Sequence, residues 1–513
     1  MKKKFLPILS ILGVGLIMAY KLGKIPYGIF CDEAKIGLVA SEVIRNNFNN
    51  FVNPLFYHHF DYLLGALPVY ATLPFIKLFG LSEFSVRLPS LIFSILSLVL
   101  IYFILEKLKS SYSLIIVLFF SVTPIFFHIS RINFGHLPSY FFLLLGYYLY
   151  LCGKETRSII QVILAGVMFG IAAYGYSGFV ISVPLIVFGI LVGELFKNKL
   201  MIGKYKYVAL LIFILSIMYI PLIVFISSNH DYTKRLRDKN TGSAKLISIE
   251  KIQIMMRNYP KYYSPDFLFK TATIDSGEFI SRHSVRGNGI FLPISAVLLL
   301  FAGIAFIIDA DKQRVKYLPF LILFLLYPLP DLLTTKDGMP PYSFSIFTTI
   351  YFLPFLCAYG LQFLLKSVSK NVVTKAIILS ILIIFATTQS AELLRNYNEY
   401  SLYSSDYWGW QSGPKEIVPL FIKESKNYDK LYMTGYFNQP DSLLSFYDPD
   451  HLCKNCFVGG ISNYNPKEKQ LFAFRVIEMS DVIKTHPELI FRKVHEINLP
   501  NGQAEYYIGY LTK

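Results

Sequence analysis

The sequence predicts a polytopic α-helical membrane protein with about eleven transmembrane helices and a small C-terminal α/β domain outside the membrane. The chain has 513 residues, of which 54% are hydrophobic and 16% are charged, and its mean hydropathy is +0.48. This composition is too apolar for a soluble protein of this length. The apolar residues are grouped into long segments as far as residue 390, whereas the region after residue 394 has no such segment.

Eleven apolar segments are candidates for membrane spans, because a spanning helix needs roughly 20 mostly apolar residues. They are residues 5–20, 88–105, 114–127, 137–151, 159–174, 179–192, 208–226, 290–308, 317–329, 344–365 and 376–390. We expect the first segment to be retained as a signal anchor, because further spans follow it and no small-residue cleavage site does.

Basic residues predict a multi-pass protein of the plasma membrane with a cytoplasmic N-terminus, because cytoplasmic loops retain lysine and arginine. If the lysines at positions 2–4 are cytoplasmic, every even-numbered connection between spans is also cytoplasmic, and each of these connections is basic. The basic residues of these connections are Lys107, Lys109, Lys154, Arg157, Lys197, Lys199, Lys204, Lys206, Lys312, Arg314, Lys316, Lys366, Lys370 and Lys375. An odd number of spans then places the C-terminal region outside. The net charge of +16 suits an anionic lipid surface, and we expect no nucleic-acid partner.

The chain is expected to divide into a transmembrane module, residues 1–394, and an extracytoplasmic α/β domain, residues 395–513. The module has two large external regions, residues 21–87 and 229–289. Helical periodicity in the first region predicts helices over residues 32–45 and 62–79, both lying at the membrane interface.

The C-terminal domain is predicted from short strand-like runs that alternate with helical pieces. The runs cover residues 431–434, 489–497 and 504–511, and Asn501-Gly502 between the last two is a hairpin signal. Cys453 and Cys456 are more consistent with a disulfide or local staple than with a zinc site, which would need further ligands at known spacings. From its position alone, this domain is expected to help bind the acceptor.

Two adjacent carboxylates, Asp32 and Glu33, begin the helix that follows the first span, and they are the candidate catalytic residues. A carboxylate at the membrane surface can act as a general base, because partial desolvation and nearby cations tune its pKa. The same acids could simply stabilise the first turn of the helix. The two interpretations are compatible.

The order of several short motifs resembles glycosyltransferase family 39, which includes relatives of the protein O-mannosyltransferases and of the lipid A aminoarabinose transferase. The resemblance covers residues 1–390 in layout. The motifs are Asp32-Glu33-Ala34, His59-Phe60-Asp61-Tyr62, Gly65-Ala66-Leu67-Pro68, Leu78-Phe79-Gly80, Val86-Arg87-Leu88-Pro89-Ser90, Ser130-Arg131, Tyr259-Pro260, Tyr263-Ser264-Pro265-Asp266-Phe267-Leu268-Phe269 and Arg282-His283-Ser284.

The resemblance implies the GT-C fold and transfer of a sugar from a polyprenyl-phosphate donor to an acceptor hydroxyl with inversion, with Asp32 as the base. The acceptor could be a protein, a lipid or a glycan. Candidates for binding the substrate or the lipid phosphate are His59, Asp61, Arg87, Arg131, His136, Arg282, His283 and Arg286. No cofactor is firmly implied. Relatives often carry an acid where His136 stands, and this departure argues against a metal-assisted mechanism. Pro340-Pro341-Tyr342-Ser343 also stands where an arginine-bearing segment is expected.

Two other classes of function remain open from the sequence. A transporter or lipid flippase is the first alternative, although the predicted spans lack the interior ionisable residues that ion-coupled carriers use. The second alternative is a binding domain carried on a structural membrane platform. Substitution of Asp32 distinguishes these classes from an enzyme.

Overall fold

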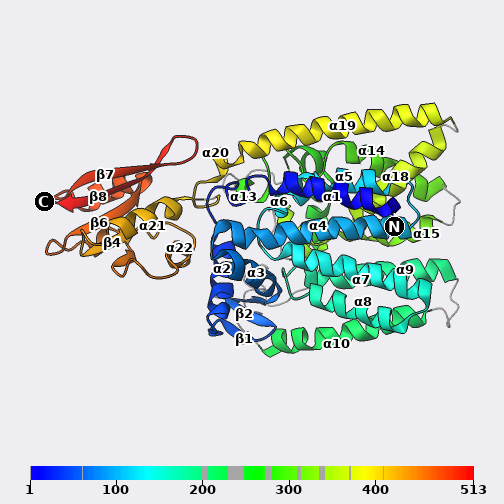
Figure 1. Cartoon of the computed structure of the whole chain (residues 1–513), viewed down its shortest axis with the longest axis horizontal. Coiled ribbons are helices and arrows are strands. Elements are labelled where there is room, and N and C mark those ends of the chain that lie inside the picture. The colour runs from blue at the N-terminus through cyan, green and yellow to red at the C-terminus, as the bar shows by residue number, and fades with distance from the viewer. Residues whose placement is uncertain are drawn as a thin grey trace.

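The computed structural model describes residues 2–60, 62–198, 205–228, 248–271, 280–308, 313–333, 341–368, 371–407 and 409–513. A bundle of roughly parallel helices occupies one part of the molecule, and a β-sheet with short helices packed on it forms the other end (Figure 1). The short helix α2 (Cys31–Ile44) lies across the end of the bundle that faces this sheet.

Each of the eleven predicted apolar segments lies on one helix or on two consecutive helices. The bundle helices are α1 (Lys2–Ala19), α4 (Glu83–Lys107), α5 (Ser113–Ser121), α6 (Pro124–Ile129), α7 (His136–Thr156), α8 (Ile159–Ala172), α9 (Phe179–Asn198), α10 (Lys206–Ser228), α14 (Ile294–Ile308), α15 (Arg314–Leu326), α16 (Leu329–Leu332), α17 (Ser343–Phe347), α18 (Phe352–Val368) and α19 (Val372–Asn398). Pro124 begins α6 and separates it from α5, because proline cannot donate a helical hydrogen bond.

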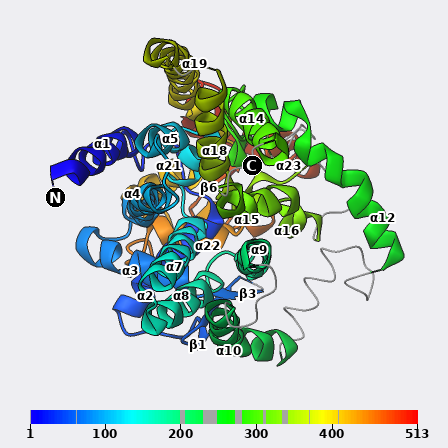
Figure 2. The same cartoon turned by 90° about the vertical axis from the view of Figure 1, so that its right-hand side faces the viewer.

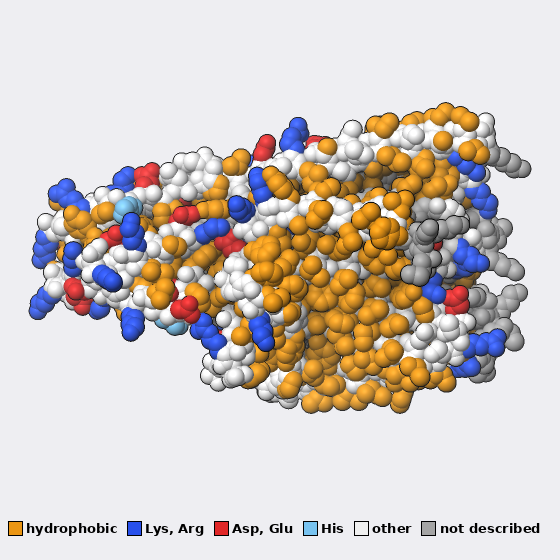
Figure 3. Space-filling model, in the orientation of Figure 1, with side chains coloured by type: hydrophobic (Ala, Val, Ile, Leu, Met, Phe, Trp, Pro, Cys, Tyr) orange, Lys and Arg blue, Asp and Glu red, His pale blue; other side chains and the backbone are white. Residues whose placement is uncertain are grey.

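The polytopic helical membrane fold is confirmed. Within the described residues, five stretches are long and apolar enough to cross a membrane, and shorter apolar helices accompany them. Hydrophobic side chains form a broad band over the helices, whereas lysine and arginine gather at its two ends (Figure 3). The end-on view places α1 and α19 on the periphery of the bundle (Figure 2). The number of crossings stays a prediction.

The first external region contains a small sheet that the sequence did not predict. Its strands are β1 (Phe51–Asn53), β2 (Phe56–His59) and β3 (Tyr62–Gly65), joined in antiparallel order. The helix expected over residues 62–79 therefore begins only at Leu67, as α3 (Leu67–Phe79), and the expected helix over residues 32–45 is α2. Aromatic residues at positions 56–62 favour an extended conformation, and their strand pairing overrides the helical periodicity.

The second external region is described in part. It contains α12 (Ile249–Asn258), the single turns η2 (Tyr259–Tyr263) and η3 (Phe267–Thr271), and α13 (Ile280–His283). Residues 229–247 and 272–279 of the predicted region 229–289 lie outside the described residues.

The C-terminal sheet has five strands in the order β5-β4-β6-β8-β7. Its elements are α20 (Tyr400–Ser404), α21 (Gly413–Glu424), β4 (Lys430–Met433), α22 (Pro440–Tyr447), β5 (Cys456–Val458), η4 (Ile461–Asn463), β6 (Gln470–Arg475), η5 (Val476–Glu478), α23 (Met479–Thr485), β7 (Ile490–Asn498) and β8 (Ala504–Thr512). Strand β4 is parallel to β5 and β6, and β8 is antiparallel to β6 and β7. The three predicted strands and their hairpin are present. The domain boundary at residue 394 stays a prediction.

The C-terminal sheet shares one hydrophobic core with the first external region. Ile36 and Val39 of α2 are buried in the same cluster as Met433, Phe446 and Ile508. A side chain at position 37 would clash with Val86 and Leu81 and would crowd Phe446, so the glycine there allows close packing of α2 against α4 and α22. Helix α2 is thus fixed between the bundle and the C-terminal sheet.

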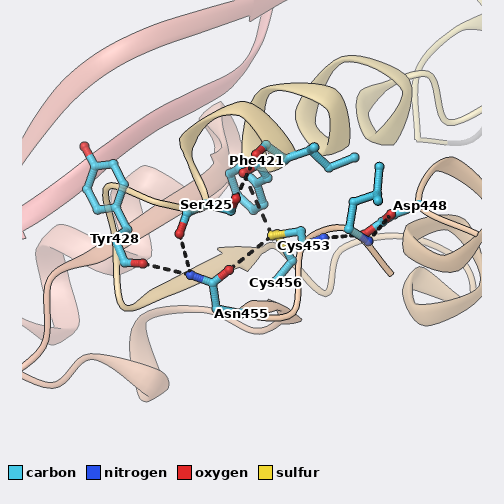
Figure 4. Close-up of a disulfide and its surroundings, with 9 residues drawn as sticks. Phe421, Ser425, Tyr428, Asp448, Cys453, Asn455 and Cys456 are labelled. Carbon is cyan, nitrogen blue, oxygen red and sulfur yellow. Dashed lines mark hydrogen bonds between the residues drawn. A yellow bond between two sulfur atoms is a disulfide. The ribbon is translucent and has the colours of Figure 1, made fainter. Parts of the chain in front are cut away.

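Cys453 and Cys456 form a disulfide, as the sequence favoured (Figure 4). Asn455 lies between the two cysteines in sequence. Its side-chain amide donates to the carbonyl oxygens of Ser425 (2.9 Å) and Tyr428 (2.8 Å). The backbone amide of Cys453 donates to the Asp448 carboxylate at 2.9 Å. The disulfide therefore closes a short loop that ties α21 to β5.

Candidate functional site

Asp32 is the second residue of α2, at the end of the bundle that faces the C-terminal sheet (Figure 1). The partial positive charge of a helix N-terminus favours a carboxylate in the first turn. The Asp32 side chain is 28% exposed, and the Cys31 thiol lies 3.7 Å from its Oδ1. Asp32 is therefore held by its helix and remains open to a ligand.

His59, the last residue of β2, contacts this carboxylate. Its Nε2 lies 3.1 Å from Asp32 Oδ1, and its Nδ1 lies 2.9 Å from the Tyr57 hydroxyl. Tyr57 and His59 share one face of the strand because they are two residues apart. Nε2 can donate a hydrogen bond to Asp32, while Nδ1 exchanges a hydrogen bond with the Tyr57 hydroxyl. The unpredicted sheet is what places His59 beside the catalytic candidate.

The environment of Asp32 favours its ionised form. Burial alone would raise the pKa of Asp32, but the hydrogen bond and charge of His59, with the charge of Arg282, hold this pKa below its usual value. Asp32 is therefore a carboxylate at neutral pH and can accept a proton.

Arg282 and His283 are the last two residues of α13, and the charge of Arg282 acts on Asp32. The Arg282 guanidinium carbon is 3.6 Å from the centre of the Phe30 ring, a cation–π contact. The Tyr342 hydroxyl lies 3.4 Å from His283 Nε2. Burial and the neighbouring Arg282 charge keep the pKa of His283 well below its usual value. The fixed cation beside Asp32 is therefore Arg282, and His283 is neutral.

Glu33 and Arg87 form a fully buried ion pair, with neither side chain exposed. The Arg87 guanidinium contacts the Glu33 carboxylate at 2.9–3.3 Å and donates to the carbonyl oxygens of Pro26 (2.8 Å) and Gly28 (2.6 Å). The backbone amide of Asn133 donates to Glu33 at 2.8 Å. We infer that this pair fixes the start of α2 in position, while the catalytic role of Glu33 and the binding role of Arg87 stay predictions.

Three other candidates from the sequence do not meet Asp32 directly. Arg131 is 1% exposed, donates to the carbonyl oxygens of Met18 and Ile25, and lines an apolar cavity of about 370 Å³ between α1 and α19. His136 is buried, with its Nε2 3.1 Å from the Phe344 carbonyl oxygen. Arg286 is exposed. Its guanidinium carbon lies 4.5 Å from the centre of the Tyr403 ring. Asp61 lies outside the described residues.

Two tyrosines near Asp32 were not predicted as site residues. Tyr176 and Tyr342 are partly exposed, and both interact electrostatically with Asp32. The Tyr176 ring stacks on His136 with centroids 3.8 Å apart. Tyr342 follows two prolines in a segment that departs from the family pattern, and that departure was a usable signal. No local pattern marks Tyr176.

Among the described residues, no group of three or more His, Cys, Asp or Glu side chains is arranged to hold a metal ion. The groups gathered around Asp32 are a histidine, a guanidinium and two phenols.

Comparisons with known proteins agree with the fold and, over residues 67–225, with the family resemblance. Residues 67–225 match the family model described as dolichyl-phosphate-mannose-protein mannosyltransferase. A comparison with curated protein sequences finds no match. A similar solved structure is that of ArnT from Cupriavidus metallidurans bound to undecaprenyl phosphate. It has a TM-score of 0.57 and 10% identity, with 98% of this chain and 97% of that chain covered.

Two further solved structures have a similar fold. One is the archaeal oligosaccharyltransferase AglB from Archaeoglobus fulgidus, in complex with an inhibitory peptide and a dolichol-phosphate, with a TM-score of 0.53, 13% identity and coverage of 93% of this chain and 70% of that chain. The other is the mycobacterial arabinofuranosyltransferase AftD, with a TM-score of 0.50, 12% identity and coverage of 98% and 39%. The chain therefore has the GT-C fold of membrane glycosyltransferases, and the resemblance drawn from its motifs is confirmed.

Proposed function

We propose that this protein transfers a sugar from a polyprenyl-phosphate-linked donor to an acceptor hydroxyl on the extracytoplasmic face of the membrane, with inversion and with Asp32 as the general base. The observation that carries the proposal is the arrangement at the start of α2. Asp32 is a partly exposed carboxylate that contacts His59 and interacts electrostatically with Arg282.

The similar proteins support a lipid-linked donor. The ArnT structure contains undecaprenyl phosphate and the AglB structure contains a dolichol-phosphate, and the matched family model is described as using dolichyl-phosphate-mannose. The distribution of basic residues supports a cytoplasmic N-terminus. The Cys453–Cys456 disulfide supports an extracytoplasmic C-terminal region, because disulfides persist in oxidising compartments.

The proposed step uses the groups beside Asp32. Asp32 accepts the proton of the acceptor hydroxyl as its oxygen attacks the anomeric carbon. The bond from that carbon to the phosphate oxygen breaks, and the phosphate leaves with the electron pair. Arg282 stabilises the charge on the leaving phosphate, because a guanidinium presents several hydrogen-bond donors in a plane. Glu33 and Arg87 keep α2 in place during this step.

The test is an assay of purified protein with a panel of radiolabelled polyprenyl-phosphate sugars that differ in the sugar. We expect sugar release or transfer from at least one donor. No release from any donor, together with movement of the lipid between the leaflets of vesicles, would instead support a flippase.

Replacing Arg282 with glutamine is expected to lower the turnover number roughly 10²-fold, because one fixed donor to the developing charge is lost. Arg395→Gln is the matched control, since Arg395 is an exposed arginine near the end of α19. Single-turnover rates at saturating donor measure the effect. Equal rates for the two variants would remove Arg282 from the mechanism.

Replacing His59 with glutamine is expected to raise the pKa of Asp32, because the charge of His59 is lost while burial continues to favour the neutral carboxyl. The base must be ionised to act, so the acidic limb of the pH–rate profile should move to higher pH. Activity well above this limb should recover toward the native value. A profile with an unmoved acidic limb contradicts the assignment of Asp32 as the titrating base.

A further inference from the structure

The parallel strands of the C-terminal sheet point their carboxyl ends toward the helical bundle. Strand β8 ends beside the C-terminus, at the end of the molecule that is farthest from the bundle (Figure 1). Strand β6 is antiparallel to β8, so it runs toward the bundle, and β4 is parallel to β6. Residues that follow β4 and β6 therefore lie at the edge of the sheet that faces the membrane module.

At this edge, the connections that follow β4 and β6 run to opposite sides of the sheet. After β4 it continues through α22 to β5 on one side, and after β6 it continues through α23 to β7 and β8 on the other. Phe446 of α22 is buried with Met433 on one face of the sheet, whereas Val482 of α23 is buried with Phe472 on the opposite face. In open α/β sheets, ligands bind outside the carboxyl ends of such neighbouring strands.

An aromatic and charged surface occupies this position. The Arg475 guanidinium carbon, at the end of β6, lies 5.8 Å from the centre of the Tyr436 ring and 5.1 Å from that of Tyr407. The two ring centroids are 6.0 Å apart. Tyr436, which follows β4, is 53% exposed. This set of three side chains is called the switch-point surface below.

The charges around the switch-point surface do not suit an anionic ligand. Arg475 is paired with Glu505 at 2.6 Å, and its backbone amide donates to the Glu478 carboxylate at 2.7 Å. The Asp406 carboxylate also interacts electrostatically with Arg475. Three carboxyl groups thus interact with Arg475. The exposed ring of Tyr436, the partly exposed ring of Tyr407 and side chains that accept and donate hydrogen bonds suit a ligand with apolar C–H faces and many hydroxyl groups.

The switch-point surface is connected to the proposed catalytic carboxylate by the chain between α20 and α21. Asp406 interacts electrostatically with Arg282, and Arg282 interacts in the same way with Asp32. Four residues after Asp406, the Trp410 ring centre lies 5.3 Å from the Arg87 guanidinium carbon, and the ring is fully buried. This connecting segment therefore places Tyr407 between the sheet and the membrane module.

We propose that the switch-point surface binds a saccharide, and that this saccharide is the acceptor of the transferred sugar. The binding half of the proposal stands on the surface itself, and the acceptor half rests on the proposed glycosyltransferase function. A sugar ring packs on the exposed face of Tyr436, and its hydroxyl groups exchange hydrogen bonds with Arg475 and the neighbouring carboxyl groups. The bound saccharide then lies on the side of the sheet that faces Asp32.

The test measures binding of the full-length protein in detergent to an immobilised panel of oligosaccharides built from hexoses, pentoses and N-acetylhexosamines. Peptides rich in serine and threonine form a second arm. No donor is present, so the outcome does not depend on turnover. We expect the native protein to bind at least one oligosaccharide, Tyr436→Ala to bind it at least tenfold more weakly, and Tyr436→Phe to retain binding because the ring is kept.

Tyr510→Ala is the matched control, because Tyr510 is another exposed tyrosine of the same sheet, 39% exposed and near the end of β8. This variant should bind as the native protein does. Binding to peptides alone, no binding to any saccharide, or the same loss in Tyr436→Ala and Tyr510→Ala would overturn the proposal. If saccharide binding is found while the donor panel yields no sugar release, the binding site stands and the glycosyltransferase function fails.

Discussion

Replacing Asp32 with asparagine is expected to lower the turnover number for sugar transfer by roughly 10²–10⁴-fold, the usual contribution of a positioned general base. Asparagine keeps the size of the side chain and can still contact His59, so the local structure should persist. Its amide cannot accept the proton of the acceptor hydroxyl. Binding of the donor should change little, because Arg282 remains to meet the phosphate.

The measurement compares single-turnover transfer with equilibrium binding of the same radiolabelled donor. Asp450→Asn is the matched control, because its side chain is 66% exposed and forms only a surface ion pair with Arg45. A lost rate with retained binding assigns Asp32 to the chemical step. Unchanged turnover in Asp32→Asn would remove the carboxylate from the mechanism, and it is the result expected of a structural platform.

Replacing Glu33 with alanine is expected to destabilise the protein by about 3–5 kcal/mol, the usual cost of leaving one member of a buried ion pair unpaired. Arg87 would keep its contacts to the carbonyl oxygens of Pro26 and Gly28, but its charge would be buried without a counter-ion. The double replacement Glu33→Leu with Arg87→Met should recover part of this loss, because no buried charge remains.

Thermal unfolding in detergent micelles measures these differences. Arg45→Ala is the control, since it breaks an ion pair whose members are 58% and 66% exposed, and an exposed pair contributes only about 0–1 kcal/mol. If Glu33→Ala unfolds at the native temperature while transfer is abolished, Glu33 acts in catalysis and the inferred structural role is wrong.

The sequence predicted the elements whose signals are local. Long apolar segments marked the helices of the bundle. Asn501-Gly502 marked the turn between β7 and β8, where the glycine adopts a φ of +85°. The strands β1 to β3 were missed, because short aromatic runs fit a helical and an extended pattern equally well. Only the pairing of β2 with β3 decides between the two.

The sequence also predicted only part of the candidate site. Asp32 and Glu33 are adjacent in sequence, yet one is partly exposed and the other is fully buried. That difference depends on Arg87, which is 54 positions away from Glu33. Motif order made Arg282 a candidate, because the resemblance fixes its place in the chain. It could not separate Arg282 from Arg286, whose exposed position depends on contact with α20.

The core shared by α2 and the C-terminal sheet has a consequence for biogenesis. During synthesis, the first external region is made before most of the membrane helices exist, while β4, β6 and β8 are still unmade. The apolar side chains of Ile36 and Val39, which are buried in that shared core, lack their C-terminal partners during this interval and are covered only by the early part of the core, such as Val69 and Val86. Stalled or truncated chains should therefore be preferred targets for membrane quality control.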